Sequence, residues 1–371
     1  MTRTARLDGR GHPSLHQINP IAYNSPFMTV AVRSFAKINL GLYIGRVRAD
    51  GFHDLRTVYQ TIALHDVIRV SVGRGSGIEI LCEDPRVPLD SSNTCYRMAE
   101  RVVDEFGAKG KITVEIEKRL PVQGGLGAAS SNAVATMIGL ERALKKSLTG
   151  ATRLRIAAEV GSDLPLFLIG GTVLGMGRGE EVYPLPDLAA APIVVVTPEV
   201  GVSTPRAFAE WDALREQAQA AELRSAGQSR AAVPTQNREL THLGASDRLL
   251  EVGRVLSSWL CDSPNTGAPA KGGSRAGSLL LDLVRTGIEN DFEKVVFPQY
   301  PELRDIKRAL ERAGARYASL SGSGSALYGF FGSRTEAVKA ADRLRKQGVK
   351  AVATSTLTRG QYWQQFLVSG C

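Results

Sequence analysis

The arrangement of apolar and polar residues predicts a strand-rich first third of the chain. Between residues 29 and 72, β-branched and aromatic residues recur in short runs separated by glycine and aspartate, which is typical of three or four strands. Residues 111–118, KITVEIEK, alternate apolar and polar side chains as a half-buried strand does. Residues 128–145 contain an apolar run with helical character, AVATMIGLERAL. The pattern therefore predicts a strand, a short loop and a helix in succession.

The same patterns predict further elements along the chain. We expect helices at residues 92–106 and 152–160, and strands at about 171–176, 180–184 and 192–197. Between about 217 and 278 the composition shifts to Ala, Gln, Ser, Gly and Pro, which indicates a partly helical, partly mobile insertion. Beyond it we expect helices near 279–286, 300–313 and 334–347, and strands at 316–320, 325–331 and 349–355. Elements in this order favour an α+β second domain stacked on the first.

The length and composition limit the class of protein. A chain of 371 residues is long enough for two domains with separate cores. With 43% hydrophobic and 22% charged residues it is typical of soluble globular proteins, and no apolar stretch approaches the ~18 residues of a membrane span. Residues 1–27 lack periodicity and a signal-peptide core, so we expect a disordered arm there, with Met28 a candidate for the true start.

The charge and the cysteines narrow the class further. The net charge of +9 raises the possibility of nucleic-acid binding, but Lys and Arg are spread along the chain without a dense basic block. A solvated basic surface that attracts small anions is the simpler interpretation. The cysteines, which lack CxxC or other ligand spacing, argue against a zinc site or a disulfide framework and favour a reducing cytoplasm. They are Cys82, Cys95, Cys261 and Cys371.

Residues 121–132, PVQGGLGAASSN, carry the strongest functional signal. Gly124, Gly125 and Gly127 leave the backbone bare, so its N–H groups can approach an oxyanion at the positive end of the following helix. Such a segment also occurs as a plain turn, but a preceding strand and a following helix are the context that a phosphate site requires. The Lys-Ser or Lys-Thr pair of the usual P-loop and the HRD motif of protein kinases are absent, so a nucleotide would be held by another scheme.

Further segments contain residues able to carry chemistry. Lys37 lies in a strand-like apolar stretch, so it is either a solvated charge at a strand edge or a functional cation. Asp163 either caps the turn that follows it or accepts a proton from an attacking hydroxyl. His53 fits an exposed loop. Residues 320–325, LSGSGS, fit a flexible turn or a second loop that closes over a triphosphate from the other domain.

These segments together resemble a known family. Segments of the 4-diphosphocytidyl-2-C-methyl-D-erythritol kinases, within the GHMP kinase superfamily, are similar in order to FAKINLGLYIGRVRADGFHDLRTVYQ, LPVQGGLGAASSNA, GSDLPLFLIGG with GRGEEVYPLP, PEVGVSTPRAF, NDFEKVV with YPEL, and LSGSGSALYGFF. The resemblance covers about residues 29–208 and 288–356. The glycine loop alone indicates the superfamily, whereas the AKIN…ADGFH segment favours this family over homoserine, mevalonate or galactose kinases.

The resemblance implies a fold and an activity. The fold is α+β, the two-domain GHMP kinase fold, with an N-terminal βαβ-type nucleotide-binding domain over 28–190, a C-terminal α+β domain over 191–371 and the active site in the cleft between them. The activity is transfer of the γ-phosphoryl group of ATP, with Mg²⁺, to the 2-hydroxyl of 4-diphosphocytidyl-2-C-methyl-D-erythritol, in the non-mevalonate isoprenoid route. The alternatives are a kinase for another small alcohol, such as homoserine, and a non-catalytic nucleic-acid-binding protein. Monomer and homodimer are both open.

The resemblance also implies roles for individual residues. Lys37 and Asp163 would be the catalytic pair, in which Asp163 takes the proton of the 2-hydroxyl and Lys37 lowers the pKa of that hydroxyl. Substrate would be bound by Asn39 at the methylerythritol part, by His53 at the cytosine edge, and by Phe52 and Phe208 stacking on the ring. ATP would be bound by Pro121, Val122, Gln123, Gly124, Gly125, Leu126, Gly127, Ala128, Ala129, Ser130, Ser131, Gly322, Ser323 and Gly324, with Ser325 completing the second loop.

Some positions depart from the family pattern. Phe52 stands where tyrosine is usual, which keeps the aromatic face and removes a hydroxyl. Gln123, Ala128 and Ala129 stand where glycines are frequent, and their side chains restrict the backbone of the phosphate loop. Ser131, at the helix start, is a candidate magnesium ligand.

Overall fold

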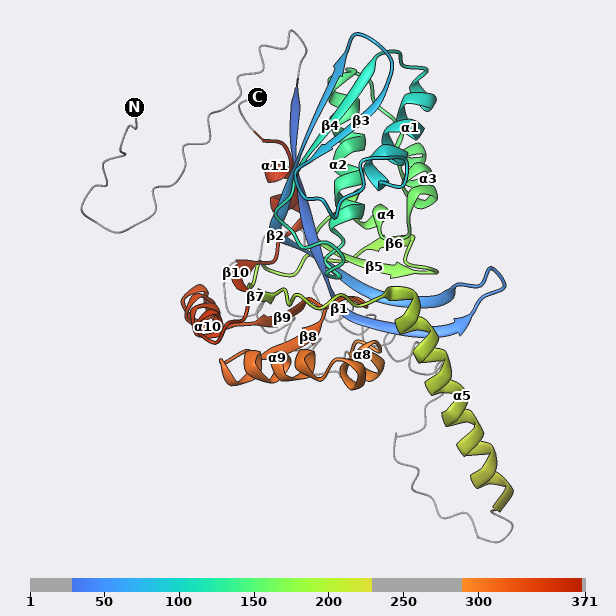
Figure 1. Ribbon diagram of the computed structural model, residues 1–371, viewed down its shortest axis with the longest axis vertical. Helices are drawn as coiled ribbons and strands as arrows, with labels where there is room; N and C mark the ends of the chain where they lie inside the picture. Colours follow the sequence, from blue (N-terminus) through green and yellow to red (C-terminus); the bar gives the residue numbers. More distant parts are fainter. Residues whose placement is uncertain (1–28, 229–288, 369–371) are drawn as a thin grey trace, which may run out of the picture.

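The computed structural model describes residues 29–228 and 289–368. Two long antiparallel strands dominate it, β1 (Val30–Val47) and β2 (His53–Gly73). The turn between them is tight, because Gly51 adopts a φ of 81° and the N–H of Arg48 donates to the carbonyl of Phe52 at 2.6 Å. Figure 1 shows this hairpin running from the upper part of the molecule into the lower part, so the same two strands serve both.

The upper part is built on the larger sheet. Its strand order is β3-β4-β2-β5-β6, with β1 paired to β2. The added strands are β3 (Gly77–Cys82), β4 (Lys111–Glu117), β5 (Thr172–Met176) and β6 (Glu181–Pro184). β3 and β4 are parallel neighbours connected through α1 (Thr94–Phe106), which makes the expected βαβ unit.

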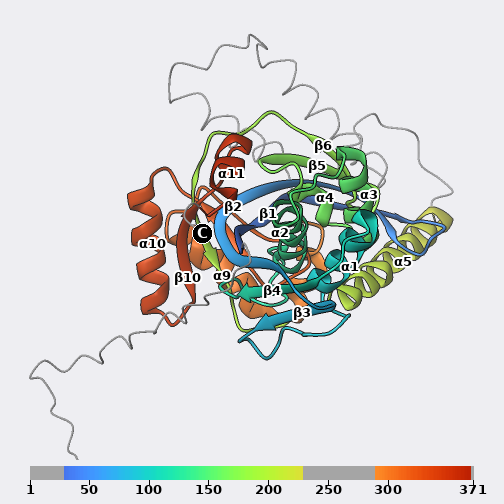
Figure 2. The same cartoon turned by 90° about the horizontal axis from the view of Figure 1, so that it is seen from above.

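Helices cover one face of this sheet. They are α1, α2 (Ala128–Ala143), α3 (Gly150–Val160) and the short α4 (Leu164–Phe167). In Figure 2, α2 lies at the centre against β1 and β2, with α1 beside it. Gly139 permits this close approach, since a Cβ there would come within 2.7 Å of Val70 Cγ2. Burial on nearly all sides explains why α2 is apolar around most of its circumference.

The lower part is built on a second sheet with strand order β10-β7-β9-β8. The strands are β7 (Pro192–Val196), β8 (Tyr317–Leu320), β9 (Leu327–Phe330) and β10 (Ala351–Ser355). Helices α9 (Pro301–Arg312) and α10 (Arg334–Lys346) pack on this sheet, and α5 (Thr204–Gln228) packs on α8 (Glu293–Gln299). None of the helices in the described part of the chain is long and apolar enough to cross a membrane.

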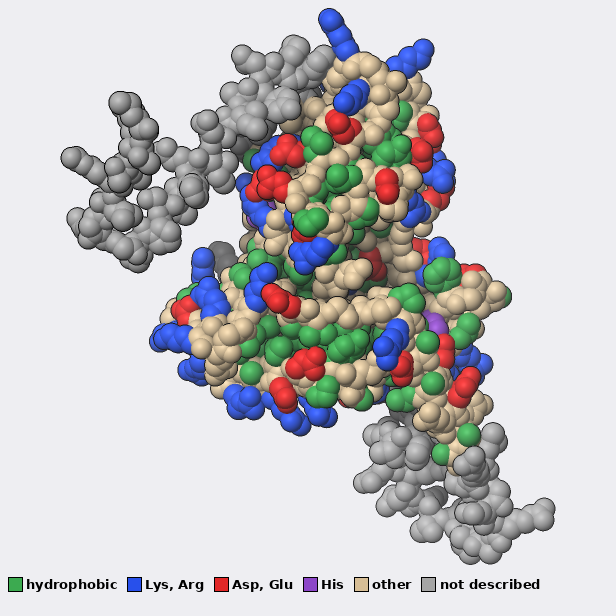
Figure 3. Space-filling view, viewed as in Figure 1, with side chains coloured by type: hydrophobic (Ala, Val, Ile, Leu, Met, Phe, Trp, Pro, Cys, Tyr) green, Lys and Arg blue, Asp and Glu red, His purple; other side chains and the backbone are tan. Residues whose placement is uncertain are grey.

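A shared apolar core joins the two parts. Ile38 and Leu40 of β1 lie in one buried cluster with Ile193 of β7 and Tyr328 of β9. The upper and lower sheets are therefore packed against each other through β1. The space-filling view in Figure 3 shows the surface hollowed at the level where the two parts meet.

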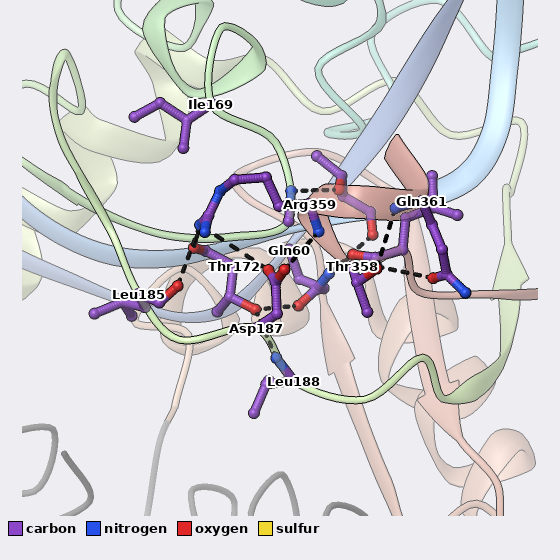
Figure 4. A network of polar contacts seen from close by, with 12 residues as sticks. Gln60, Ile169, Thr172, Leu185, Asp187, Leu188, Thr358, Arg359 and Gln361 are labelled. Carbon is purple, nitrogen blue, oxygen red and sulfur yellow. Dashed lines mark hydrogen bonds and ion pairs between the residues drawn. The ribbon is translucent and has the colours of Figure 1, made fainter. Parts of the chain in front are cut away.

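The C-terminal helix α11 (Arg359–Phe366) returns to the upper part of the molecule. Figure 4 shows the polar contacts at its start, where Arg359 Nη2 donates to the carbonyls of Thr172 and Leu185, each at 3.1 Å. The Arg359 N–H also donates to Asp187 Oδ2 at 2.8 Å. Residues after 355 therefore pack on the N-terminal part, although the boundary near residue 190 assigns them to the second domain. That boundary stays a prediction.

Many of the expected elements are present, but the longest strands and the shortest helices differ from the prediction. The three or four strands expected over 29–72 are the two long strands β1 and β2, while β3 lies beyond that interval. The short helices α4, α8 and α11 were not predicted, and α5 begins well before the expected insertion. The expected arm over 1–27, the expected helix at 279–286 and most of the 217–278 insertion lie outside the described residues.

Candidate active site

The glycine-rich loop, residues 121–127, connects β4 to the start of α2. Gly127 occupies the N-cap of α2 with a φ of 69°, and no side chain caps the first turn. The N–H groups of that turn therefore have no side-chain partner, which is the arrangement that favours an anion. Glycine is required here, because a Cβ at Gly127 would lie 2.9 Å from Phe167 Cζ and 3.0 Å from Lys37 Cγ.

A second loop, residues 321–325 between β8 and β9, touches the first. Ser321 Oγ donates to the carbonyl of Gly125 at 3.0 Å, and the Ala326 N–H donates to the carbonyl of Gly124 at 3.0 Å. Side chains are excluded from this contact, because a Cβ at Gly125 would come within 2.1 Å of the Ser321 carbonyl. The residues expected to bind ATP thus lie close together. They form the first loop and the first turn of α2 in the upper part of the molecule, and the second loop in the lower part.

Lys37 and Asp163 lie next to these loops. Lys37 is 3% exposed, and its Nζ lies 3.4 Å from Asp163 Oδ2 and 2.7 Å from Asn39 Oδ1. Its backbone N–H donates to the carbonyl of Leu126 at 2.9 Å, which fixes β1 against the glycine loop. A Cβ at Gly322 would lie 3.4 Å from Lys37 Nζ, so the second loop also reaches the lysine. The interpretation of Lys37 as a solvated charge at a strand edge is therefore wrong.

Asp163 stands immediately before α4, with its side chain 33% exposed. It occupies the N-cap position, but its side chain makes no capping hydrogen bond. Instead one oxygen faces Lys37 and the other accepts a hydrogen bond from the hydroxyl of Tyr59 at 3.0 Å. The capping role that the sequence left open is not seen in the structure, and the carboxylate is turned toward Lys37.

Strand pairing explains how these side chains meet. In the β1–β2 pair, Asn39 lies directly opposite Tyr59, and Lys37 lies two residues before Asn39 on the same face. The pairing register shifts between Phe35 and Lys37 and again just after Asn39. Such irregularities re-aim side chains locally. Tyr59 was missed by sequence reasoning, since its partner Asp163 is far away along the chain.

Asn39 is held by hydrogen bonds within the protein. Its Oδ1 accepts from Lys37 Nζ, and its Nδ2 donates to Thr57 Oγ1 at 2.7 Å. The side chain is 1% exposed. In this conformation Asn39 orients the lysine, and its expected contact with the methylerythritol part of a substrate stays a prediction.

His53 and Phe208 come together beside the site, on β2 and α5. The two rings stack with centroids 4.8 Å apart and planes 17° apart, and His53 Nε2 lies 2.7 Å from Asp212 Oδ1. His53 is 8% exposed, so the exposed-loop interpretation is wrong. Phe52 is 52% exposed, and its ring lies 5.0 Å from the Arg178 guanidinium carbon. The predicted cytosine contacts of Phe52, His53 and Phe208 stay predictions.

A buried polar network holds the root of the glycine loop. Asp66, on β2, is fully buried and accepts from the N–H groups of Arg119 and Leu120, each at 2.7 Å, and from Lys118 Nζ at 2.6 Å. Asn132 Nδ2 donates to the same carboxylate at 3.0 Å. Residues 118–120, just before the loop, and Asn132 of α2, after it, are thereby bound to one carboxylate. The signal in the sequence was an aspartate inside an apolar strand, which alone does not reveal its partners.

Ser131 belongs to the edge of that network. Its hydroxyl lies 2.8 Å from Ser34 Oγ, and Ser34 Oγ donates to Asn132 Oδ1 at 2.6 Å. Ser131 is 1% exposed and is turned toward β1. The candidate role of this hydroxyl as a magnesium ligand therefore gains no support from its geometry.

Replacing Asp66 with asparagine is expected to lower the free energy of unfolding by about 3–5 kcal/mol, because the buried Lys118 ammonium loses its counter-charge. The KM for ATP is also expected to rise, since the loop root loses its anchor. Chemical denaturation and steady-state kinetics measure the two effects. Glu115→Gln is the matched control, because this carboxylate on neighbouring β4 makes an exposed ion pair with Arg69. A cost for Asp66→Asn no larger than that of the control would contradict the anchoring role.

Comparisons with known proteins identify the class. Residues 93–171 match the family described as "GHMP kinases N terminal domain", and residues 275–350 match "GHMP kinases C terminal". A solved structure titled as a homoserine kinase from Cytophaga hutchinsonii shares the fold, with a TM-score of 0.60 at 20% identity over 91% of this chain and 96% of that chain. The fold and the two glycine loops thus define a GHMP kinase, an ATP-dependent phosphotransferase.

Sequence identity narrows this to one family. A "4-diphosphocytidyl-2-C-methyl-D-erythritol kinase" of Solibacter usitatus (strain Ellin6076) is 35% identical over 314 residues, 84% of each chain. One of Moorella thermoacetica (strain ATCC 39073 / JCM 9320) is 33% identical over 87% of this chain and 98% of its own length. A crystal structure of 4-(cytidine 5'-diphospho)-2C-methyl-D-erythritol kinase superposes with a TM-score of 0.62 at 25% identity, covering 88% of this chain and 98% of that chain. This chain belongs to the 4-diphosphocytidyl-2-C-methyl-D-erythritol kinase family.

Proposed function

We propose that the chain transfers the γ-phosphoryl group of ATP to the 2-hydroxyl of 4-diphosphocytidyl-2-C-methyl-D-erythritol, in the non-mevalonate route to isoprenoid precursors. The observation that carries this proposal is the Lys37–Asp163 pair, 3.4 Å apart, at the point where the two glycine loops meet. Family membership supports the acceptor, because the relatives that match most of the chain are named for it.

The reaction needs one proton acceptor and a compensating positive charge. The 2-hydroxyl oxygen attacks the γ-phosphorus, its proton passes to Asp163, and the bond from the γ-phosphorus to the bridging oxygen breaks so that ADP leaves. The Lys37 ammonium stabilises the alkoxide character that develops on the attacking oxygen. The roles fit the burial, since Lys37 is nearly inaccessible to water while Asp163 is open on one side.

The phosphate loops supply binding and orientation. Backbone N–H groups of the first loop and the uncapped first turn of α2 are positioned for the phosphates, and residues 322–324 close the same space from the second sheet. Because a Cβ at Gly125 or Gly324 would collide with the opposite loop, the contact tolerates no side chain. Gln123 adopts a φ of 59°, in the left-handed region that glycine favours and that is strained for a residue with a side chain.

Magnesium accompanies ATP in this proposal. The described residues contain no group of three or more His, Cys, Asp or Glu side chains that could hold a metal ion. That fits an ion which takes most of its ligands from phosphate oxygens and water. When bound, Mg²⁺ neutralises charge on the phosphates. Asp163, the carboxylate paired with Lys37, is assigned to proton transfer in this proposal and not to metal binding.

The cytidine end would lie at the His53–Phe208 side of the site. His53 carries a carboxylate partner, Asp212, that fixes its ring by a 2.7 Å contact. A fixed imidazole next to an aromatic face suits a flat heterocycle with hydrogen-bonding edges. We also propose a cytoplasmic location, which is supported by free thiols at Cys82 and Cys95.

The acceptor is tested by steady-state ADP release with a panel of alcohols. We expect turnover with 4-diphosphocytidyl-2-C-methyl-D-erythritol to exceed that with homoserine or mevalonate by at least about 10³-fold in kcat/KM, because those alcohols cannot use the His53–Phe208 side. The acceptor without its cytidine moiety is the matched control and should lose most of the kcat/KM. Preferred turnover of homoserine would reject the proposed acceptor and leave the kinase class in place.

A further inference from the structure

Tyr59 of β2 completes a three-residue cluster with the catalytic pair. Its hydroxyl donates to Asp163 Oδ1 at 3.0 Å, while Lys37 Nζ lies 3.4 Å from Asp163 Oδ2. The lysine also lies over the tyrosine ring, with Nζ 5.6 Å from the ring centroid. One oxygen of the carboxylate thus accepts a hydrogen bond from Tyr59 and the other is ion-paired with Lys37, and the lysine lies over the tyrosine ring.

The backbone around Tyr59 is shaped to hold its ring in place. A Cβ at Gly175 on β5 would come within 2.4 Å of Tyr59 Cε2. A Cβ at Gly179, which has a φ of 106°, would come within 2.7 Å of the Tyr59 hydroxyl. Tyr59 is 2% exposed. Two glycines therefore form a slot that fits the ring and directs the hydroxyl at Asp163.

The charges around Tyr59 keep it a hydrogen-bond donor. Burial, and then the negative charge of Asp163, raise the pKa of Tyr59 well above its usual value of 10. The other groups facing the cluster are Lys37 from β1 and Glu180 from the turn before β6, and Glu180 is itself paired with Arg178 at 3.3 Å. Tyr59 therefore stays protonated through neutral and mildly alkaline pH.

We propose that Tyr59 is a positioning residue of the kinase: it orients the Asp163 carboxylate toward the acceptor hydroxyl. The inference rests on the proposed function, in which Asp163 accepts the proton. The competing explanation is that Tyr59 is a core residue whose buried hydroxyl needs an acceptor. The two explanations differ in whether removal of the hydroxyl lowers kcat while the KM values for both substrates are kept.

The test is Tyr59→Phe, which removes the hydroxyl and keeps the ring in its slot. We expect kcat to fall about 10- to 100-fold with KM for both substrates within about threefold, because orientation of the base is lost rather than a substrate contact. Removal of a merely structural hydroxyl would lower the free energy of unfolding and leave kcat near its wild-type value.

Tyr362→Phe is the matched control. Tyr362 is also fully buried, and its hydroxyl donates to the carbonyl of Phe167 at 2.7 Å, at the far end of α4 from Asp163. It should lose a similar amount of stability while kcat stays near its wild-type value. Gly175→Ala is a second test, because the added Cβ displaces the Tyr59 ring while the hydroxyl is retained, and it should lower kcat with both KM values kept, as Tyr59→Phe does.

Asp163→Asn separates this inference from the proposed function. If Asp163→Asn abolishes turnover while Tyr59→Phe has a wild-type kcat, the role of Tyr59 is overturned and the proposed base stands. If Asp163→Asn turns over normally, the base assignment fails and the role of Tyr59 fails with it. We expect Tyr59→Phe to add no further loss of kcat in the Asp163→Asn background, because both changes act through one carboxylate.

Discussion

Asp163→Asn is expected to lower kcat for ADP release by about 10²–10⁴-fold, because an amide of the same shape cannot accept the proton of the attacking hydroxyl. The equilibrium binding of ATP should stay near its wild-type value, whereas the free energy of unfolding should fall, because the buried Lys37 ammonium loses its counter-charge. Asp163 makes no capping hydrogen bond to α4, so the helix itself does not depend on its charge. Stopped-flow or coupled measurement of ADP release, titration of ATP binding and chemical denaturation measure the three quantities.

A surface carboxylate serves as the control for Asp163→Asn. Asp305 on α9 is 67% exposed and pairs with Arg308 at 3.7 Å. Asp305→Asn should keep wild-type kcat, which would show that loss of a negative charge alone does not slow the enzyme. Turnover of Asp163→Asn within about tenfold of wild type would mean that another group takes the proton, and the assigned base would be wrong.

Lys37→Met is expected to reduce kcat by about 10²–10⁴-fold, since the positive charge that balances the developing alkoxide is removed from a water-excluded position. A methionine fills nearly the same volume in the apolar surroundings of Gly127 and Phe167. The Asp163 carboxylate that remains is one-third exposed and keeps the hydrogen bond from Tyr59, so water can solvate its charge. We therefore expect the free energy of unfolding to change little.

The combination of lost activity and retained stability distinguishes a functional lysine from a structural one. Lys111→Met is the control, because Lys111 on β4 is half-exposed and pairs with Glu79 on the surface at 3.0 Å. It should change neither kcat nor stability by a large factor. A Lys37→Met enzyme that unfolds much more readily than wild type would indicate that the lysine holds the fold and that its effect on kcat is indirect.

Local patterns predicted much of the fold, because most elements form from residues near each other in sequence. The alternation over 111–118 and the apolar run after the glycine loop correspond to β4 and α2. The long hairpin was predicted as shorter strands, because Gly45 interrupts the pattern of β1. In the structure Gly45 lies within the strand and gives close approach, since a Cβ there would come within 2.9 Å of the Asp54 carbonyl.

The short helices show the limit of periodicity. Helix α4 has four residues, fewer than two turns, so no repeat of apolar positions can form. Helix α11 carried a local signal, the capping box between Thr358 and Gln361, which both residues form in the structure. Its docking depends on Phe167 and Asp187, which no local pattern links to it.

Individual residues of the site could be predicted from the sequence, but their arrangement in space could not. Lys37 and Asp163 could be proposed one at a time, yet their 3.4 Å contact depends on the β1 register and on the place of α4. Tyr59 and Asp66 belong to no sequence motif, because their roles depend on partners in other elements. Tyr59 bonds to Asp163, and Asp66 accepts from Asn132. Polar residues in buried strands are therefore the positions where long-range partners should be sought.

The central claim is tested most directly by identifying the product. The purified protein is incubated with ATP, Mg²⁺ and 4-diphosphocytidyl-2-C-methyl-D-erythritol, and the mixture is followed by ³¹P NMR. We predict a new phosphomonoester signal that grows together with ADP and shows no three-bond coupling to a proton, because the 2-carbon carries no hydrogen whereas the carbons of the other hydroxyls do. Release of ADP without this signal, or a phosphate on a different hydroxyl, would contradict the proposed reaction.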